Sequence, residues 1–399
     1  MGTGSLVEAV VSRSSCQGQA AEARGTGEIH ARLLIGPIAS DPTESVSAVN
    51  RALIKGLQTR YCFCGHRSDR YHGLTKQGRL NLVNLWYLAI QLSGWIGRLV
   101  RMRPALAHYA LNSGWAMEKS LVFLGVARLM GAHTLAHLHA GKFVEFWSGL
   151  PTWRKWWALR VLRRLDGLVV LSEGWKRAIV QTLGLPEDRV FVVHNPIDKG
   201  FESAALEMPV ERASPLVLCL GVMEKAKGIW DILTAADMLR ARCKVQFVLA
   251  GPEREPDIHR KVKAFIDTHS LQETVCLRGV VWGQDKIELF RQASIFLLPS
   301  YFENFPLVVL EAAAAGCALV TTPVGAIPEF FEHGVSALFV EPGKPDQIAE
   351  AIQWLVEHPD ERVRLGRAAR EVFTTRLGRD KIMADMDRVY QAILSRPRV

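Results

Sequence analysis

The chain has 399 residues, of which 49% are hydrophobic and 22% are charged, and its formal net charge at pH 7 is +9. This composition excludes an intrinsically disordered protein, and the length is too great for one ordinary core, so we expect two domains of about 150 to 200 residues each. The seven cysteines show no metal-ligand spacing, which argues against a zinc site and favours buried thiols in a reducing compartment.

The chain begins with a stretch rich in Gly, Ala, Ser and Gln, for which we predict a flexible tail. Residues 1–30 also lack the apolar segment of a secretion signal. From Arg32 onward, short apolar runs bounded by Gly, Ser or Pro alternate with longer helical stretches. They predict an N-terminal α/β domain at 31–200, with strands at 32–38, 134–141, 167–172 and 190–196.

Two segments of this domain are candidates for contact with a membrane. Residues 80–100 are apolar but are interrupted by two Asn, a Gln, two Gly and an Arg, which favours an amphipathic or buried helix over a membrane span. Residues 147–166 interleave Trp with Arg and Lys. That pattern suits a helix with one solvated face over a buried Trp/Leu face, and equally an anionic membrane surface, nucleic acid or a phosphorylated acceptor.

The second half of the chain shows a clearer alternation of strands and helices. Hydrophobic periodicity is lost at 201–214, which we interpret as an interdomain linker. Five fully apolar runs then predict parallel strands covered on both faces, at 215–221, 245–251, 274–279, 294–300 and 317–323. We therefore predict a second doubly wound α/β domain at 215–375, followed by a C-terminal helix at 376–399 that packs back on the N-terminal domain.

Two glutamates, eight positions apart, follow the predicted strand 294–300. Ligands of doubly wound sheets bind at the carboxyl ends of the strands, which places Glu303 in a binding loop. Pro306 suits a first helical turn, so Glu311 lies about one turn into the next helix. A carboxylate surrounded by Leu, Val and Ala needs a partner, and the two hydroxyls of a ribose suit it. The alternatives are a helix-surface residue for Glu311 and a loop carboxylate without a role for Glu303.

Another loop, 221–228, connects a predicted strand to a helix that opens at Gly228. It carries two lysines, and Lys227, directly before the helix, is placed to neutralise a diphosphate. Solvated loop lysines without a ligand are the alternative.

These motifs carry a resemblance to a known family. The segment "ENFPLVVLEAAAAGCALVTTPVG", the 221–228 loop, "VVHNPID" and "GLVVLSEGWK" together resemble glycosyltransferase family 4, over roughly residues 32–372. The resemblance implies the GT-B fold, in which two Rossmann-like doubly wound domains face a central cleft, and retaining transfer of a sugar from a nucleoside diphosphate. It also implies that Glu303 contacts the donor sugar, that Glu311 holds the ribose and that Lys227 binds the diphosphate.

In the N-terminal domain, the resemblance places His139 after a strand and near the anomeric carbon, while we expect His137 to point to the opposite face of that strand. Other residues implied in donor binding lie in the strand-end loops: Asn304, Phe305, Pro306, Lys225, Gly221, Gly251, Asn195 and Gly325. The chain departs from the family in having Val222 where Arg is usual, Ala326 where a second Gly is usual, and no Gly-Gly after the first strand. Lys225 would supply part of the charge that is missing at Val222.

We therefore expect a retaining, hexosyltransferase-type glycosyltransferase in the biosynthesis of a cell-surface polysaccharide, lipopolysaccharide or glycolipid. Its donor would be a nucleotide sugar and its acceptor lipid-linked or saccharide, without a nucleic-acid partner. No Asp-x-Asp lies at a strand end, so we expect no catalytic metal and no other cofactor. We place it in the cytoplasm, either free or peripheral on the inner face of an anionic membrane.

Two further readings remain open at this point. One is a non-catalytic sugar-nucleotide-binding partner protein, which the departures from the family suggest, and the other is a sugar-nucleotide epimerase of the same fold. A nucleotide-dependent oxidoreductase would need Gly-x-Gly-x-x-Gly after the first strand, and "LLIGPIASDP" does not supply it.

Overall fold

The computed structural model describes residues 31–41, 44–68, 82–212 and 214–397, so the predicted tail at 1–30 lies outside the described residues. The chain forms two compact units, which we call unit 1 (residues 1–194 and 382–399) and unit 2 (residues 195–381). Each unit is built around its own sheet and its own apolar core.

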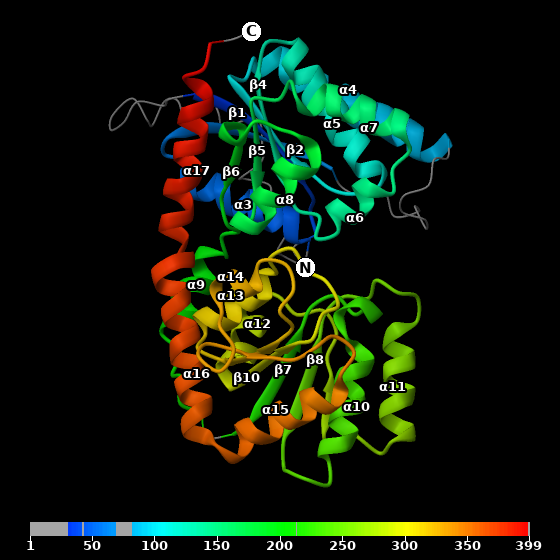
Figure 1. The fold of residues 1–399 in the computed structure, drawn as a ribbon, viewed down its shortest axis with the longest axis vertical. Coiled ribbons are helices and arrows are strands. Elements are labelled where there is room, and N and C mark those ends of the chain that lie inside the picture. The colour runs from blue at the N-terminus through cyan, green and yellow to red at the C-terminus, as the bar shows by residue number, and fades with distance from the viewer. Residues whose placement is uncertain (1–30, 42–43, 69–81, 213, 398–399) are drawn as a thin grey trace, which may run out of the picture. The chain divides into compact units, whose positions relative to one another are not determined.

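Unit 1 contains a sheet of six strands (Figure 1). Every strand pair in it is parallel, and the strand order is β2-β1-β3-β4-β5-β6. Its strands are β1 (Ala31–Ile38), β2 (Tyr61–Arg67), β3 (Leu106–Leu111), β4 (His133–Leu138), β5 (Gly167–Val170) and β6 (Val190–Val192). The sequence predicts four of them but not β2 or β3. Both missed strands carry buried histidines, His66 and His108, but the predicted strand β4 also carries two, His133 and His137, so the histidines alone do not account for the miss.

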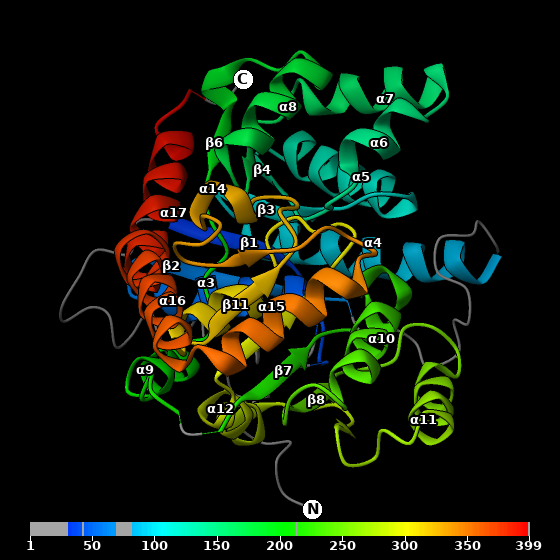
Figure 2. The same ribbon diagram turned by 60° about the horizontal axis from the view of Figure 1, so that its bottom comes forward.

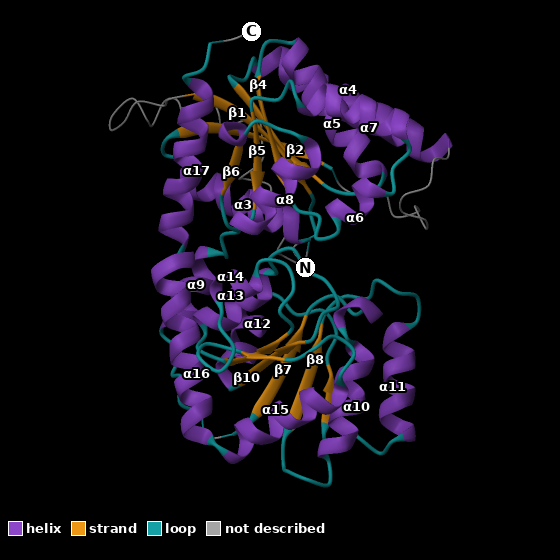
Figure 3. Cartoon of the chain, viewed as in Figure 1, coloured by secondary structure: helices purple, strands orange, loops and turns teal. Residues whose placement is uncertain are grey.

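Successive residues of β3 show how the two faces of this sheet are covered. Tyr109 packs edge-on against Trp95 of α4 (Leu82–Met102) and Phe123 of α5 (Trp115–Leu129), with ring centroids 5.2 Å apart in both pairs. Its neighbour His108 points to the other face and contacts Tyr390 of α17 (Arg379–Leu394). Helices therefore lie on both sides of the sheet (Figure 3). The other helices among the described residues of unit 1 are α3 (Ser45–Leu57), α6 (Phe143–Ser148), α7 (Thr152–Leu162) and α8 (Glu173–Leu183).

The helix α4 corresponds to the segment predicted at 80–100. It buries Trp95 and Leu99 against unit 1 and leaves Trp86, Ile90 and Val100 exposed, which is an amphipathic pattern. Within the described ranges, no helix is long and apolar enough to cross a bilayer.

Unit 2 contains a second six-stranded parallel sheet, with the order β12-β11-β10-β7-β8-β9. Its strands are β7 (Leu216–Leu220), β8 (Gln246–Ala250), β9 (Val275–Leu277), β10 (Ile295–Leu298), β11 (Ala318–Thr321) and β12 (Leu338–Phe339). The five predicted strands are all present. The sixth, β12, has only two residues, too few to give a sequence pattern.

Helices cover this second sheet in the same way. Among them, α10 and α15 lie side by side (Figures 1 and 2). The helices of unit 2 are α9 (Lys199–Leu206), α10 (Ile229–Leu239), α11 (Ile258–Thr268), α12 (Gly283–Gln292), α13 (Leu307–Ala314), α14 (Ile327–Phe330), α15 (Pro345–Glu357) and α16 (Pro359–Val372). The two sheets with their covering helices are the two Rossmann-like domains that the sequence predicts.

The stretch 201–214, interpreted above as a linker, is not free of regular structure. The helix α9 occupies its first part, because Asp198 caps the helix by accepting hydrogen bonds from the backbone N–H groups of Gly200 (2.9 Å) and Phe201 (3.2 Å). Phe201 is buried and packs edge-on against Phe290 of α12. A helix of eight residues with two buried side chains is too short for its periodicity to stand out in the sequence.

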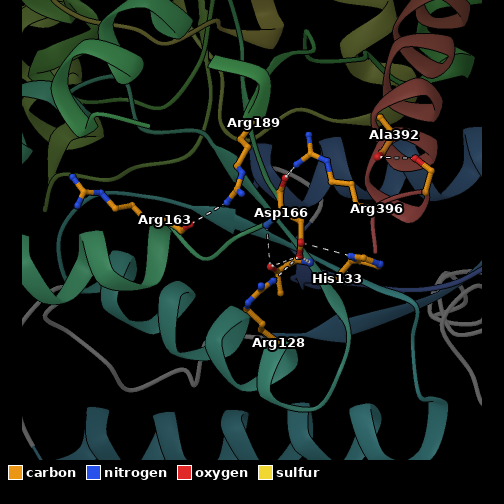
Figure 4. Close-up of polar contacts among 9 residues, drawn as sticks. Arg128, His133, Arg163, Asp166, Arg189, Ala392 and Arg396 are labelled. Atoms are coloured by element: carbon orange, nitrogen blue, oxygen red, sulfur yellow. Dashed lines mark hydrogen bonds and ion pairs between the residues drawn. The ribbon is translucent and has the colours of Figure 1, made fainter. Parts of the chain in front are cut away.

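The C-terminal segment from Ile382 onward belongs to unit 1. Its last described part is held by Arg396, whose guanidinium donates to the carbonyl oxygens of Asp166 (2.5 Å) and Asp188 (3.1 Å). The Asp166 carboxylate in turn accepts hydrogen bonds from the Thr134 backbone N–H (2.8 Å) and from Arg128 (3.1 Å) (Figure 4). This anchor ties the end of the chain to the segment that leads into β5.

Candidate functional site

The ends of β7 and β8 form the first part of the candidate site in unit 2. Gly221 donates its backbone N–H to the Ala250 carbonyl at 3.0 Å. Gly251 has φ +147°, and a Cβ placed on it would lie 1.7 Å from the Gly221 carbonyl oxygen, so this position requires glycine. A Cβ on Gly221 would meet no atom within 4 Å. The backbone at Gly221 is therefore open to a ligand, whereas Gly251 is required by the packing of the two loops.

The predicted phosphate-binding lysine lies in the same loop. Residues Lys225–Lys227 form a 3₁₀ turn that ends at Gly228 in the left-handed conformation (φ +74°). The Lys227 ammonium lies 2.5 Å from Glu303 Oε1, which also accepts a hydrogen bond from the Ser300 hydroxyl at 2.8 Å. Lys227 and Glu303, predicted from separate motifs, are therefore in direct contact.

The backbone around Glu303 is held by a close approach from another strand end. Gly325 has φ +61°, and a Cβ on it would lie 2.5 Å from the Glu303 carbonyl oxygen and 2.3 Å from that of Asn304. Ala326 donates its backbone N–H to the Asn304 carbonyl at 2.8 Å. This contact keeps the loop after β10 against the loop after β11. Having Ala326 where the family usually has a second glycine does not disturb the contact, because only position 325 requires a glycine.

Glu311 lies inside the helix α13, with Pro306 directly before the first helical residue. Its side chain is 6% exposed, and Oε1 is 2.5 Å from the Lys286 ammonium of α12. Among the residues that the structure describes, Oε2 has no hydrogen-bond partner. Burial raises the pKa of Glu311 and the nearby Asp198 adds to the increase, while Lys286 opposes it. A buried carboxylate oxygen without a partner is a ready acceptor for a ligand hydroxyl.

Lys286 is a residue that the sequence analysis missed. It occupies one position of an ordinary amphipathic helix, and only its contact with Glu311 distinguishes it from a surface lysine. Its ammonium also lies 5.1 Å from the ring centroid of Phe201. No local sequence signal connects these three residues, because they come from three different helices.

The other residues predicted to bind the donor also lie in unit 2, in different roles. Asn195 donates from its side-chain amide to the Phe305 carbonyl at 3.1 Å, and its own Oδ1 has no partner among the described residues. Phe305 is buried and stacks on Phe330 with centroids 5.0 Å apart, so its side chain supports the loop. Asn304 is also buried, whereas Lys225 is exposed.

His139, the predicted residue of unit 1, directly follows β4. The expectation that His137 points to the opposite face is wrong, because the two rings lie together with centroids 4.2 Å apart. Residues two positions apart along a strand share a face, which brings the two rings to the same side. Burial lowers the pKa of His139 to about 4. His139 is therefore a neutral imidazole near pH 7, able to donate or accept a hydrogen bond but not to act as a cation.

A second polar group of unit 1 was not predicted. Ser68 accepts hydrogen bonds from Gln91 (3.2 Å) and from the Lys119 ammonium (3.4 Å). Burial lowers the pKa of Lys119 to about 8. Within the described part of the chain, neither the buried Tyr109 hydroxyl nor the nitrogens of the His66 ring have hydrogen-bond partners. These groups lie toward the carboxyl ends of β1 to β3, the edge at which ligands bind in sheets of this kind.

The Trp- and Arg-rich segment at 147–166 contains α7, and its tryptophans are not all buried. Trp147 is buried, but Trp153 and Trp156 are 67% and 63% exposed. The interpretation of a buried Trp/Leu face is therefore wrong for these two side chains. Spacings of three and four residues place the exposed Trp and Arg residues of the segment on one stripe of the helix and its C-terminal end: Trp153, Trp156, Arg160, Arg163 and Arg164.

Among the described residues, no group of three or more His, Cys, Asp or Glu side chains is arranged to hold a metal ion.

Comparison with known proteins gives consistent matches over both units. The family model "Glycosyltransferase Family 4" matches residues 49–201, and "Glycosyl transferases group 1" matches residues 207–372. An alpha-maltose-1-phosphate synthase of Mycolicibacterium smegmatis is 29% identical over 282 residues, which cover 65% of this chain and 71% of that protein.

Solved structures with low sequence identity share the fold. The sucrose-phosphate synthase of Thermosynechococcus elongatus superposes with a TM-score of 0.73 at 18% identity, over 91% of this chain and 99% of that one. Anabaena HepE in complex with UDP-glucose superposes with a TM-score of 0.68 at 16% identity, over 91% of this chain and 100% of that one. Both units are therefore found together in proteins of the GT-B fold.

Proposed function

The chain belongs to glycosyltransferase family 4, and we propose that it transfers a sugar from a nucleoside diphosphate to an acceptor hydroxyl with retention of the anomeric configuration. The observation that carries this proposal is the contact between Lys227 and Glu303 at the carboxyl ends of the unit 2 strands. It joins a cation suited to a leaving diphosphate with a carboxylate suited to sugar hydroxyls.

The proposed chemistry follows from where charge develops. Breaking the bond between the anomeric carbon and the diphosphate leaves negative charge on the phosphate, which a fixed cation stabilises. Lys227 supplies that cation, and the open backbone at Gly221 lets the diphosphate approach closely. Before the donor binds, Lys227 and Glu303 neutralise each other, so the donor phosphate replaces one partner of an existing pair rather than meeting an isolated charge.

Glu303 and Glu311 then divide the donor between them. With its ammonium partner turned toward phosphate, Glu303 is available to accept hydrogen bonds from the sugar. Glu311 offers Oε2 to a ribose hydroxyl, while Lys286 favours the ionised form of the carboxylate. We further propose that no divalent metal is needed, because Lys227 and backbone N–H groups balance the phosphate charge. Addition of EDTA should then leave turnover unchanged.

For the acceptor, we propose a lipid-linked or saccharide hydroxyl presented at an anionic membrane surface, as in the assembly of a cell-surface polysaccharide or glycolipid. The exposed stripe of α7 supports this, because it combines two tryptophans with three arginines. Arg160 lies over the Trp156 ring, 5.7 Å from its centroid. Exposed Trp86, Ile90 and Val100 on α4 add apolar surface in the same unit, and both helices contact α5.

The test is a thermal-shift panel of UDP-, GDP- and ADP-sugars, with Glu311→Gln as the control variant. One nucleotide class should raise the Tm of the protein, and Glu311→Gln should reduce that increase. Turnover with the selected donor and a lipid extract, followed by NMR of the product's anomeric proton, then tests transfer and retention. Absence of any shift with all three classes would contradict the proposal.

The same assays separate the two alternatives. A non-catalytic partner protein would show the thermal shift without turnover, and an epimerase would release an altered sugar nucleotide in the absence of any acceptor.

A further inference from the structure

A row of four side chains crosses the interior of unit 1 and ends at His139. The Tyr390 hydroxyl lies 2.8 Å from His108 Nδ1, and His108 Nε2 lies 3.3 Å from His137 Nδ1. The His137 ring then contacts the His139 ring, with centroids 4.2 Å apart. Tyr390, His108 and His137 are buried, and only His139 is partly exposed.

The direction of the hydrogen bonds follows from the partners that are present. Among the described residues, Tyr390 has one hydrogen-bond partner, His108, so if its oxygen accepted there, its own O–H would be left unpaired in the interior. The hydroxyl therefore donates to His108 Nδ1, and the proton of His108 is on Nε2. That proton is donated to His137 Nδ1, so His137 in turn carries its proton on Nε2.

All three histidines of the row are neutral near pH 7. Burial lowers the pKa of His108 to about 3 and that of His139 to about 4, and it lowers the pKa of His137 well below its usual value. A neutral imidazole has two tautomers, and the partner at one nitrogen decides which of them is present. Tyr390 thus selects the tautomer of His108, and His108 selects that of His137.

We propose that Tyr390 and His108 are positioning residues for His139, a role that rests on the proposed glycosyl transfer and on the place near the anomeric carbon that the family resemblance implies for His139. They hold His137 in one tautomer and one ring orientation, and the His137 ring forms the wall against which His139 packs. Neither Nε2 of His137 nor Nε2 of His139 has a hydrogen-bond partner among the described residues. The ring contact with His137 is therefore the interaction that we expect to orient His139.

The row also gives α17 a function beyond closing the apolar core. The helix contributes Tyr390 to the histidines, and one turn earlier it contributes Asp387, which accepts a hydrogen bond from Tyr61 at 2.7 Å. Tyr390 and Tyr61 thus each place a buried hydroxyl in a hydrogen bond inside unit 1. Only the hydrogen bond of Tyr390 belongs to the row of side chains that ends at His139. The chain thus contains a matched pair of tyrosines, one in the row and one outside it.

The experiment compares Tyr390→Phe with Tyr61→Phe. Each variant loses one buried hydroxyl between the sheet and α17, so each should lower the Tm by a similar small amount. Only Tyr390→Phe should lower kcat, by about tenfold, because a displaced ring near the reacting carbon loses alignment. The affinity for the nucleoside diphosphate should stay unchanged in both variants. ¹⁵N spectra of the histidine side chains should show a single tautomer of His137 in the wild type and a mixture in Tyr390→Phe.

A further variant, together with the comparison of Tyr390→Phe and Tyr61→Phe, distinguishes failure of the positioning role from failure of the proposed function. His108→Gln interrupts the row at its centre and should reproduce the loss of kcat with unchanged nucleotide affinity. Equal kcat values in Tyr390→Phe and Tyr61→Phe, or an unaltered His137 tautomer, would overturn the positioning role while leaving the proposed function intact. If instead His139→Ala retains full activity, the role of His139 itself fails.

Discussion

Glu311 shows at the level of single residues how burial leaves a carboxylate oxygen available as an acceptor. A surface glutamate would be satisfied by water, but the side chain of Glu311 is 6% exposed and keeps one oxygen without a partner among the described residues. An unmatched buried acceptor costs about 1 to 3 kcal/mol, and a ligand hydroxyl recovers part of that cost on binding. Lys286 makes the arrangement tenable, because it supplies a positive charge to a carboxylate whose pKa burial raises.

Replacement of Lys286 by methionine tests this pair. Without the ammonium, the pKa of Glu311 should rise further, so the carboxylate binds a proton at higher pH than in the wild type. Because a raised folded-state pKa costs stability as pH increases above the unfolded value, Lys286→Met should lose about 3 kcal/mol at pH 8 and less at pH 6. Urea unfolding at the two pH values measures this difference.

Nucleotide affinity gives the second readout for the same variant. Binding through ionised Glu311 should weaken in Lys286→Met, and more so at pH 6 than at pH 8. The double variant Lys286→Met/Glu311→Gln removes the titrating group and should show no such pH dependence between pH 6 and 8. If the nucleotide affinity of Lys286→Met does not depend on pH, the proposed role of Lys286 is contradicted.

At the level of elements, the loops that end β7 and β8 contain a glycine required by packing, Gly251, and a glycine for which we propose contact with the diphosphate, Gly221. Gly251→Ala should destabilise unit 2 by more than about 2 kcal/mol, because its Cβ would lie 1.7 Å from the Gly221 carbonyl oxygen. Gly221→Ala should fold with nearly unchanged Tm, because its Cβ has no neighbour within 4 Å. It should nevertheless weaken nucleoside diphosphate binding, which calorimetric titration measures. Unchanged affinity in Gly221→Ala would remove this loop from the proposed diphosphate site.

The helix α7 is the element that we expect to bind an anionic membrane surface. Wild-type protein should float with vesicles that contain anionic lipids at low salt, and release as salt increases. The double variant Trp153→Ala/Trp156→Ala should remain in the soluble fraction, because it removes the apolar part of the stripe. Trp282→Ala, which removes a tryptophan 57% exposed in unit 2, is the matched control and should float normally. Equal flotation of both variants would exclude α7 as the contact.

For the whole molecule, the two units should respond differently to acid. Burial lowers the pKa of four histidines of unit 1: His66 to about 3, His108 to about 3, His139 to about 4, and His137 well below its usual value. In the unfolded chain, histidine binds a proton near pH 6.5, so the unfolded state takes up protons first. Stability from these groups is therefore complete above about pH 6.5 and falls as pH decreases toward the folded values.

Each of these histidines costs about 1.4 kcal/mol per pH unit in that window. Unit 1 should consequently unfold before unit 2 when the pH is lowered from 7 to 5. Hydrogen exchange followed by mass spectrometry resolves the two units in one experiment, with unit 2 as the internal control. Earlier loss of protection in unit 2 would show that these four histidines do not limit acid stability.

The sequence alone determined the features that are encoded locally. Continuous apolar runs predicted the five longer strands of unit 2, and their carboxyl ends placed Lys227, Glu303 and Glu311 in strand-end loops or the following helix. Both inferences depend on residues close together in the chain. The same reasoning missed β2 and β3, although it found β4, which also contains histidines.

Only the tertiary structure decided which distant residues meet. The pairing of Lys286 with Glu311 joins two helices, and the contact of Tyr390 with His108 spans 282 positions of the chain. Hydrophobic periodicity reports which face of an element is buried, but it does not report which polar group it meets there. Those partners are set by the order of the strands in the sheet and by the packing of helices on it, and these arise only when the whole chain folds.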